Sequence, residues 1–267
     1  EFALEAMKHP VGEAPVPLPA PLNGFKFQYF PTLTADNRFL LFTGRPAASS
    51  GEDLYVSRQN KDGTFGAPMP ISPVINSSYN EGAGSISGDG KTLVFASCDR
   101  PKAIGNCDLY ISRRTGNNWS TPVNLGINVN STEWDSQPSL SADGRTLYFT
   151  STRRGGQGQE DIYVTTLQPN GTWSAAKNLG TPVNTAGKDM APFIHASGTT
   201  LYYVTDGLIG MGGLDVFRCE KTPAGTWSEP RNLGYPLNTF ENEASLFITS
   251  DNQRGFCSRS RASNEPT

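Results

Sequence analysis

Short runs of aliphatic and aromatic residues recur along the chain at a nearly constant interval. Each run follows a turn-forming pair of residues, and runs of this composition are typical of buried β-strands. The turn pairs tolerate the left-handed backbone of a tight hairpin. The pairs are Asp36-Asn37, Asp89-Gly90, Asp143-Gly144, Ser197-Gly198 and Asp251-Asn252, and the runs that follow them are 39–42, 92–95, 146–149, 200–203 and the weaker 255–257.

Two further features recur at the same interval of about 54 residues. A third strand is predicted after each of a series of aspartates, and a fourth element carries a large aromatic residue that we expect in the core between repeats. One unit is therefore four short strands joined by turns, which is the organisation of a propeller blade. The aspartates are Asp53, Asp108, Asp161 and Asp215, and the aromatic residues are Phe65, Trp119, Trp173 and Trp227.

An asparagine after an aliphatic residue also repeats, with steps of 53, 54, 54 and 54 residues. Its regularity favours a structural role. We expect the side chain to satisfy its own backbone in a turn, where the chain leaves one blade and enters the next. The members of this series are Asn23, Asn76, Asn130, Asn184 and Asn238.

Strands one and two occur five times, which predicts an all-β fold with five four-stranded antiparallel blades. Residues 15–18 align with the fourth element at 122–125, so we expect this N-terminal strand to complete the last blade and to remove an open sheet edge. The propeller would cover 13–267. Residues 1–10 favour a helix, and 1–12 are expected to be a leader or the end of a preceding helical domain.

Composition supports this picture and narrows the partners. The content of 28 Gly and 20 Pro, with 36% hydrophobic residues, favours a turn-rich β-fold. The net charge is −3 and basic residues form no stripe, which argues against nucleic acid as a partner. No apolar run approaches the roughly 20 residues of a membrane helix, so this domain is not expected to insert into a membrane.

Four cysteines are present, and two of them, Cys98 and Cys107, stand nine residues apart across a predicted hairpin. That spacing is too wide for a CxxC redox or zinc site. Two interpretations stay open. All four cysteines are small buried hydrophobic residues, or Cys98 and Cys107 form a disulfide, which would indicate an oxidising compartment.

A polar column stands just before the inner strand of each repeat, near the expected mouth of the central channel. We weigh three roles for it: a structural group that pairs with turn amides or arginines, a binding site at the channel mouth for a cation or a basic partner, and a pair of glycosidase acids. Sameness between repeats favours the first role, because a glycosidase needs two acids in different environments. The column is Gln28, Glu81, Asp135, Asp189 and Glu243, and the expected arginines are Arg45, Arg100, Arg153 and Arg261.

Trp134 breaks the repeat beside this column, because its equivalents are Phe27, Asn80, Lys188 and Asn242. With Phe27, Tyr29 and Tyr79 it could form an aromatic patch on the channel face. Tyrosine and tryptophan are enriched at binding surfaces. Ordinary packing of a loop is the alternative.

The segments S-A-D-G-R-T-L-Y-F and D-I-Y-V between residues 141 and 164 resemble the WD-like propeller repeats of the TolB type. With the segment W-S-x-x-x-N-L-G, they are similar to the propeller of PorE-type envelope proteins of the Bacteroidetes type IX secretion system. There the propeller lies between a tetratricopeptide domain and an OmpA-like peptidoglycan-binding domain. The resemblance covers residues 12–267.

This resemblance implies a periplasmic location and association with the outer membrane. It also implies a non-catalytic interaction scaffold within a multiprotein envelope assembly. The expected partners are other envelope or secretion-system proteins, or an extended peptide segment. We expect no catalytic residue, no resident metal and no cofactor, with a cation at the channel mouth as the alternative. A carbohydrate-active propeller that uses the channel carboxylates is the second functional hypothesis.

Overall fold

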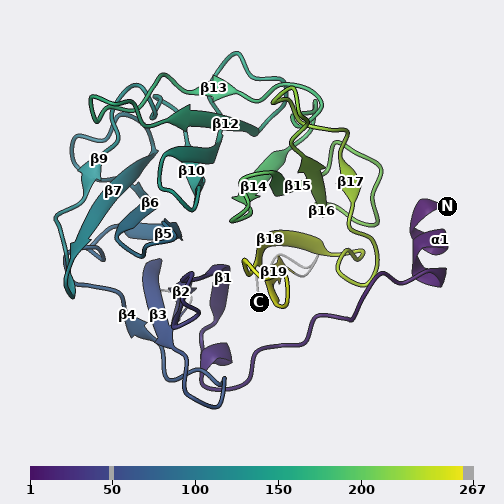
Figure 1. The fold of residues 1–267 in the computed structure, drawn as a ribbon, viewed down its shortest axis with the longest axis horizontal. Coiled ribbons are helices and arrows are strands. Elements are labelled where there is room, and N and C mark those ends of the chain that lie inside the picture. Colours follow the sequence, from purple (N-terminus) through teal and green to yellow (C-terminus); the bar gives the residue numbers. More distant parts are fainter. Residues whose placement is uncertain (48–50, 261–267) are drawn as a thin grey trace.

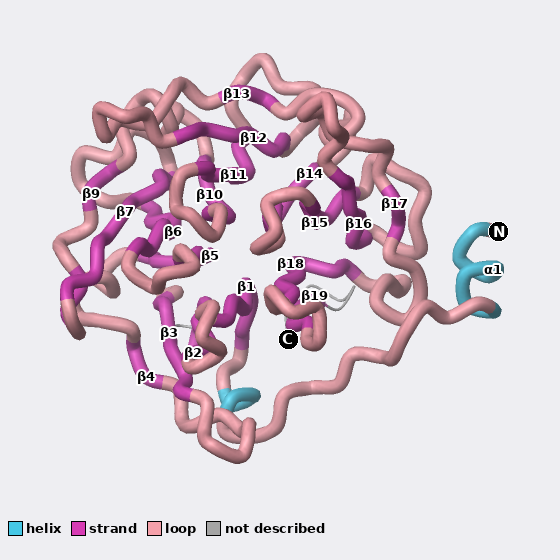
Figure 2. Tube along the Cα trace, viewed as in Figure 1, coloured by secondary structure: helices cyan, strands magenta, loops and turns pink. Residues whose placement is uncertain are grey.

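Antiparallel sheets stand around a common axis in the computed structural model, which describes residues 1–47 and 51–260. Figure 1 shows the sheets following one another around the ring in chain order. The all-β propeller predicted from the repeat is confirmed. Helix is confined to α1 (Phe2–Lys8) and the 3₁₀ turn η1 (Leu22–Gly24) in the described part of the chain, and Figure 2 shows α1 set apart from the ring.

Four sheets contain four or more strands, which pair in sequence order from the channel outwards except that β9 pairs with β7 in the second sheet. The first contains β1 (Phe27–Leu33), β2 (Phe39–Arg45), β3 (Asp53–Arg58) and β4 (Met69–Pro70). The second contains β5 (Asn80–Ile86), β6 (Thr92–Cys98), β7 (Cys107–Thr115), β8 (Asn118–Trp119) and β9 (Val123–Asn124). The third contains β10 (Asp135–Leu140), β11 (Thr146–Ser151), β12 (Asp161–Thr166) and β13 (Lys177–Asn178). The fourth contains β14 (Asp189–Ile194), β15 (Thr200–Thr205), β16 (Asp215–Glu220) and β17 (Arg231–Asn232).

The fifth sheet contains only β18 (Asn242–Ile248) and β19 (Gly255–Ser260) among the described residues. Four blades are therefore described in full, and a complete fifth blade stays a prediction. Packing nevertheless closes the circle, because Phe247 and Phe256 of this sheet join a hydrophobic cluster with Leu33 and Phe42 of the first sheet.

The predicted N-terminal closing strand is wrong, because residues 10–20 form no strand. Pro15, Pro17 and Pro19 alternate along this segment, and proline has no N–H group to donate to a sheet. Leu18 instead packs against the cluster between the last and first sheets. The segment follows the outside of the β18–β19 sheet, as Figure 1 shows.

The hydrophobic core is divided among the interfaces between neighbouring sheets. Between the second and third sheets, for example, Val94 and Leu109 pack against Phe149 and Trp173. Every strand two and strand three contributes aliphatic or aromatic side chains to such a cluster, which explains the hydrophobic runs of the sequence. The predicted aromatic column lies in or against these clusters; its members are Phe65, Trp119, Trp173 and Trp227.

The repeated asparagine is structural, but its role differs from the one predicted. The side chain of Asn130 does not bond its own backbone. Its Oδ1 accepts the Leu109 N–H at 2.8 Å, and its Nδ2 donates to the Leu109 carbonyl at 3.0 Å. One side chain therefore satisfies both backbone groups of a residue on β7, as a neighbouring strand would. The same pair of bonds joins Asn76 to Leu54, Asn184 to Ile162 and Asn238 to Val216.

The N-L-G segment of the repeat holds this asparagine in place. Oδ1 of Asn124 accepts a hydrogen bond from Asn130 Nδ2 and another from the Gly126 N–H, both at 2.8 Å. Gly126 has a φ of +79°, which a residue with a side chain rarely adopts. The motif is repeated with Asn178 and Asn232, so the W-S-x-x-x-N-L-G pattern is a device for positioning the asparagine.

Replacement of Asn130 by alanine should leave the buried N–H of Leu109 unpaired, while the Leu109 carbonyl keeps its hydrogen bond from the Leu125 N–H at 3.0 Å. We expect the free energy of unfolding to fall by about 1–3 kcal/mol, measured by urea denaturation. Asn23→Ala is the matched control, because Asn23 is exposed at η1 and its substitution should change stability by less than about 0.5 kcal/mol. Equal losses from the two substitutions would contradict this role.

Candidate functional site

The four carboxylates of the polar column do not face the channel. Glu81, Asp135, Asp189 and Glu243 are all 0% exposed. In each of their repeats, a serine or threonine that directly follows the repeated asparagine hydrogen-bonds the carboxylate of the next sheet. Ser131, for example, donates its backbone N–H and its hydroxyl to Asp135 Oδ2, at 2.6 and 2.7 Å. The column is thus part of the connection between sheets.

Arginines complete this arrangement in the second and third sheets. Arg153 donates to Asp135 Oδ1 at 2.6 Å and to the Val129 carbonyl at 2.5 Å. Its guanidinium carbon lies 4.6 Å from the centre of the Tyr163 ring. Arg100 makes the equivalent contacts to Glu81 and Ile75. The carboxylate of each pair is buried, the arginine is partly buried, and the hydrogen bonds between them compensate the desolvation of charge.

Arg259 is a partner of Glu243, and the predicted Arg261 lies outside the described residues. Arg259 Nε donates to Glu243 Oε1 at 3.0 Å. Arg259 pairs directly opposite Glu243 in the β18–β19 register, where Ser151 stands opposite Asp135 in the third sheet. The arginine therefore approaches its carboxylate from two positions earlier in the strand.

Asp189 has no arginine partner in the described part of the chain. Gly207 takes the equivalent position, and a side chain there would come within 1.9 Å of Thr185 Oγ1. The Thr185 backbone N–H donates to Asp189 at 2.6 Å. Burial raises the pKa of Asp189, and the nearby carboxylate of Asp161 adds to the effect.

Glu243 lies next to a second buried carboxyl group, Asp215 of β16. Burial raises the pKa of Glu243 to about 7, and repulsion from Asp215 adds to this rise, while Thr239 and Arg259 oppose it. Burial also raises the pKa of Asp215. Both groups are held inside the junction between the fourth sheet and β18–β19, where neither is exposed.

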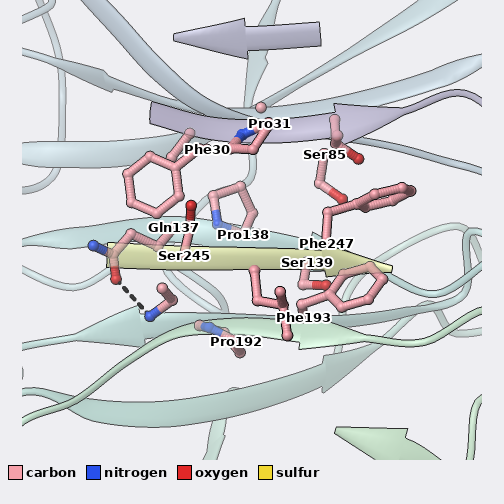
Figure 3. A pocket seen from close by; sticks show the side chains of 15 residues that line it. Phe30, Pro31, Ser85, Gln137, Pro138, Ser139, Pro192, Phe193, Ser245 and Phe247 are labelled. Atoms are coloured by element: carbon pink, nitrogen blue, oxygen red, sulfur yellow. Dashed lines mark hydrogen bonds between the residues drawn. The ribbon is translucent and has the colours of Figure 1, made fainter. Parts of the chain in front are cut away.

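The centre of the channel is narrow. The middle parts of β1, β5, β10, β14 and β18 enclose a cavity of only about 40 Å³, whose lining Figure 3 shows. Phe30, Pro138, Phe193 and Phe247 project into it. A small-molecule site usually requires a few hundred Å³, so the channel centre is a packed interior and not a binding site for a sugar or peptide.

A larger cavity, of about 600 Å³, opens where β1, β5 and β10 begin and β6 ends. We call it the mouth pocket. Small residues of the second sheet, among them Gly82, Ala83 and Ala96, form one side of it, and larger side chains of the first and third sheets flank them. The flanking side chains include Tyr29, Phe30, Glu52, Trp134 and Gln137.

The Cys98–Cys107 disulfide, present in the structure, forms part of the same pocket. It joins the end of β6 to the start of β7, and the hairpin between them lies against the segment that carries Trp134. The Asn106 N–H donates to the Glu133 carbonyl at 3.2 Å, and Cys107 pairs with Trp134 in a parallel bridge. The disulfide and Trp134, the two departures from the repeat noted in the sequence, are therefore neighbours.

The other predicted members of the aromatic patch are placed differently. Tyr29 lines the mouth pocket with Trp134, but Phe27 and Tyr79 are not among its described lining residues. Phe27 is buried, and the guanidinium carbon of Arg45 lies 5.2 Å from its ring centre. The predicted patch is thus reduced to Tyr29 and Trp134.

Sequence reasoning missed two acidic residues of the pocket, Glu52 and Asp99. Burial, followed by the interaction with Glu52, raises the pKa of Tyr29. A usable signal existed in the inner strands, because the second repeat has Gly82 where the first has Tyr29. A small residue beside a large one in the neighbouring repeat indicates a hollow, but only the fold shows which loops border it.

No group of three or more histidine, cysteine, aspartate or glutamate side chains is placed to hold a metal ion within 1–47 and 51–260. The predicted carboxylates are separated by the sheets that contain them. Nothing in their arrangement resembles the shared oxygen cage that a hard cation requires.

Comparison with known proteins supports the fold. No protein-family model and no curated protein matches this chain. Among solved structures, TolB from Acinetobacter baumannii is similar at 17% identity with a TM-score of 0.55, covering 90% of this chain and 53% of its own. The chain thus spans about half of the length of that protein.

Two glycoside hydrolase structures are similar to the same degree. A thermostable family-43 glycoside hydrolase gives a TM-score of 0.57 at 12% identity, covering 94% of this chain and 89% of its own. A family-43 enzyme, GH43B, of the Bacteroides ovatus xyloglucan locus gives 0.55 at 14% identity, covering 90% and 50%. At such identities the likeness shows a propeller fold and does not decide between binding and catalysis.

No helix among the described residues is long and apolar enough to cross a membrane.

The raised pKa of Glu243 predicts that stability falls as the pH rises. A carboxyl group with a folded pKa of about 7 and an ordinary value of 4.5 binds more protons in the folded state between these values. Its contribution is complete below about pH 4.5 and is lost by about pH 7, amounting to roughly 3 kcal/mol at most. Urea denaturation across pH 4.5–8 should show this slope.

Glu243→Gln should remove that part of the slope, because the amide does not titrate, while the exposed Glu13→Gln should leave it unchanged. An identical pH dependence in wild type and Glu243→Gln would show that Glu243 is already ionised throughout the range.

Proposed function

We propose that this chain is a non-catalytic protein-interaction domain of a periplasmic, outer-membrane-associated protein, part of a type IX secretion assembly of the kind that the sequence resemblance implies. Its partner is another envelope protein that inserts an extended segment into the mouth pocket. The chain would be linked to peptidoglycan through a further domain of the whole protein. One observation supports the proposal. The repeated carboxylates are buried between sheets, whereas the open mouth pocket is lined by residues that depart from the repeat, among them Tyr29, Trp134 and the Cys98–Cys107 disulfide.

The buried acids argue against catalysis by the channel carboxylates. A glycosidase acid and its nucleophile or base must both reach the scissile bond. Asp135 is covered and already accepts hydrogen bonds from Ser131 and Arg153. The cavity at the centre of the channel is also too small for a sugar ring.

The carbohydrate-active alternative rests on the fold similarity to family-43 glycoside hydrolases. Under that hypothesis some of Glu81, Asp135, Asp189 and Glu243 would perform hydrolysis. Such a role requires that the sheets open to expose a carboxylate, with loss of the bonds that hold it. The interaction proposal requires no such opening.

Replacement of Asp135 by alanine separates these two functions. We expect a loss of about 3–5 kcal/mol in the free energy of unfolding, because Arg153 is left as an uncompensated, largely buried charge. The wild type should hydrolyse no member of a glycan panel that includes xylans, arabinans and sialosides. Hydrolysis by the wild type that is abolished in folded Asp135→Ala and Glu243→Ala would refute the interaction proposal and support the enzyme.

Partner capture tests the interaction proposal itself. In a cross-linked pull-down from an envelope fraction, wild-type protein should retain a defined set of proteins that Trp134→Asn loses. Lys188→Asn is the matched control, because Lys188 occupies the same repeat position in another sheet, outside the pocket. Undiminished capture by Trp134→Asn would remove the mouth pocket as the interaction site.

A further inference from the structure

We propose that the mouth pocket binds the cationic side chain of a lysine or arginine from an extended segment of the partner protein. This inference rests on the proposed function and adds the chemistry of recognition. The lining side chains of the pocket, its net charge and the backbone contacts that position its walls support this proposal.

Aromatic side chains flank small residues in the mouth pocket. Tyr29 and Phe30 come from β1, Trp134 comes from the start of β10, and small residues of the second sheet lie between them. The equivalents of Tyr29 in the other repeats are Gly82, Ser136, Met190 and Ala244. Aromatic side chains thus flank a hollow at this junction, whereas the corresponding position elsewhere in the ring carries no aromatic residue.

The charge of the pocket favours a cation. Glu52 and Asp99 contribute two carboxylates and Arg45 one guanidinium, which leaves a net charge of −1 among the lining residues. The guanidinium of Arg45 lies over the Phe27 ring. Aromatic faces attract cations, most strongly when water is excluded, so a carboxylate and an aromatic wall act on an incoming ammonium or guanidinium group in the same direction.

Glu52 is held ready for this role. Its backbone N–H donates to Asn80 Oδ1 at 3.0 Å, and its side chain is near enough to Tyr29 to contribute to the raised pKa of that residue. A side chain at residue 82 would come within 3.4 Å of Glu52 Oε2 and within 3.2 Å of Thr43. Gly82 therefore leaves space beside the carboxylate. A fixed acceptor loses less side-chain entropy when it binds its partner.

The disulfide hairpin fixes the opposite wall. A side chain at residue 105 would lie 2.1 Å from the Glu133 carbonyl oxygen, so only glycine lets the hairpin approach the Trp134 segment this closely. Asp99, the residue after Cys98, has a φ of +60° and donates its N–H to the Asn106 carbonyl at 3.0 Å. The acid and the tryptophan thus lie on two segments that are joined by backbone contacts.

A neutral sugar is the competing ligand, because Asn80, Asn106 and Gln137 provide amides that suit hydroxyl groups. Amides do not distinguish a sugar from a peptide backbone. The excess of carboxylate over guanidinium groups attracts a cation more strongly than a neutral ligand, and it therefore favours lysine or arginine over a sugar.

The test uses acetylated and amidated nonapeptides of glycine and serine with one central residue, which is lysine, arginine, glutamine or glutamate. Binding is followed by the NMR signal of the Trp134 indole N–H, assigned from its loss in Trp134→Phe. We expect saturable shifts with the lysine and arginine peptides, at least tenfold weaker binding of the glutamine peptide, and none with glutamate. Binding should weaken as NaCl rises from 20 to 500 mM.

Glu52→Gln and Asp99→Asn should each weaken binding of the lysine peptide at least fivefold, in proteins whose spectra show an intact fold. Glu13→Gln, an exposed acid outside the pocket, should have no effect. Equal binding of the glutamine peptide, absence of any shift, or tighter binding of xylose or N-acetylglucosamine would overturn the proposal. If Trp134 still governs partner capture in that case, the proposed function stands and only the cationic ligand is wrong.

Discussion

The structure depends on a repeated asparagine side chain that hydrogen-bonds the backbone of the third strand of one sheet, where the chain passes to the next sheet. Asn130 satisfies both the N–H and the carbonyl of Leu109 on β7, and the next residue, Ser131, hydrogen-bonds the carboxylate of Asp135 on β10. Two consecutive residues thus form hydrogen bonds to two consecutive sheets. Because each blade buries its hydrophobic faces only against its neighbours, the relative position of the sheets determines whether the core packs. The connection sets that position once per repeat.

This constraint explains why the repeated carboxylates are buried between the sheets. Asp135 completes the connection and is compensated by Arg153. At Asp189 the arginine is missing, and Gly207 makes room for Thr185 instead. The partner of the buried carboxylate thus differs between repeats, while its place in the connection between sheets is the same. Under the proposed function, binding falls to positions that this connection does not use, such as Tyr29 and Trp134.

Much of the fold could be predicted because its period is written directly in the residues. The turn pairs adopt positive φ at Asn37, Gly90 and Gly144, as their residue types require. The partners of polar side chains were harder to predict. Spacing shows that Asn130 recurs, but not that its partner stands 21 residues earlier. Likewise Arg259 pairs with Glu243 because strand register places it directly opposite, which residue spacing alone did not show.

The candidate site was only partly accessible from sequence, for a similar reason. Trp134 was recognisable as an exception to its repeat, whereas Glu52 and Asp99 lie in loops that the fold alone brings to the same hollow. The N-terminal closing strand failed on local chemistry, since alternating prolines cannot donate to a sheet. The repeat pattern of the sequence predicts the strands and turns, whereas side-chain contacts between sheets can be identified only from the structure.

The most direct test of this separation between scaffold and site is the unfolding free energy of Trp134→Asn, which installs the residue that Asn80 and Asn242 provide in other repeats. If function resides in departures from the repeat, urea denaturation should show a loss below about 1 kcal/mol. A loss of about 3 kcal/mol or more, the size expected for a core substitution, would show that Trp134 belongs to the scaffold and would contradict the account.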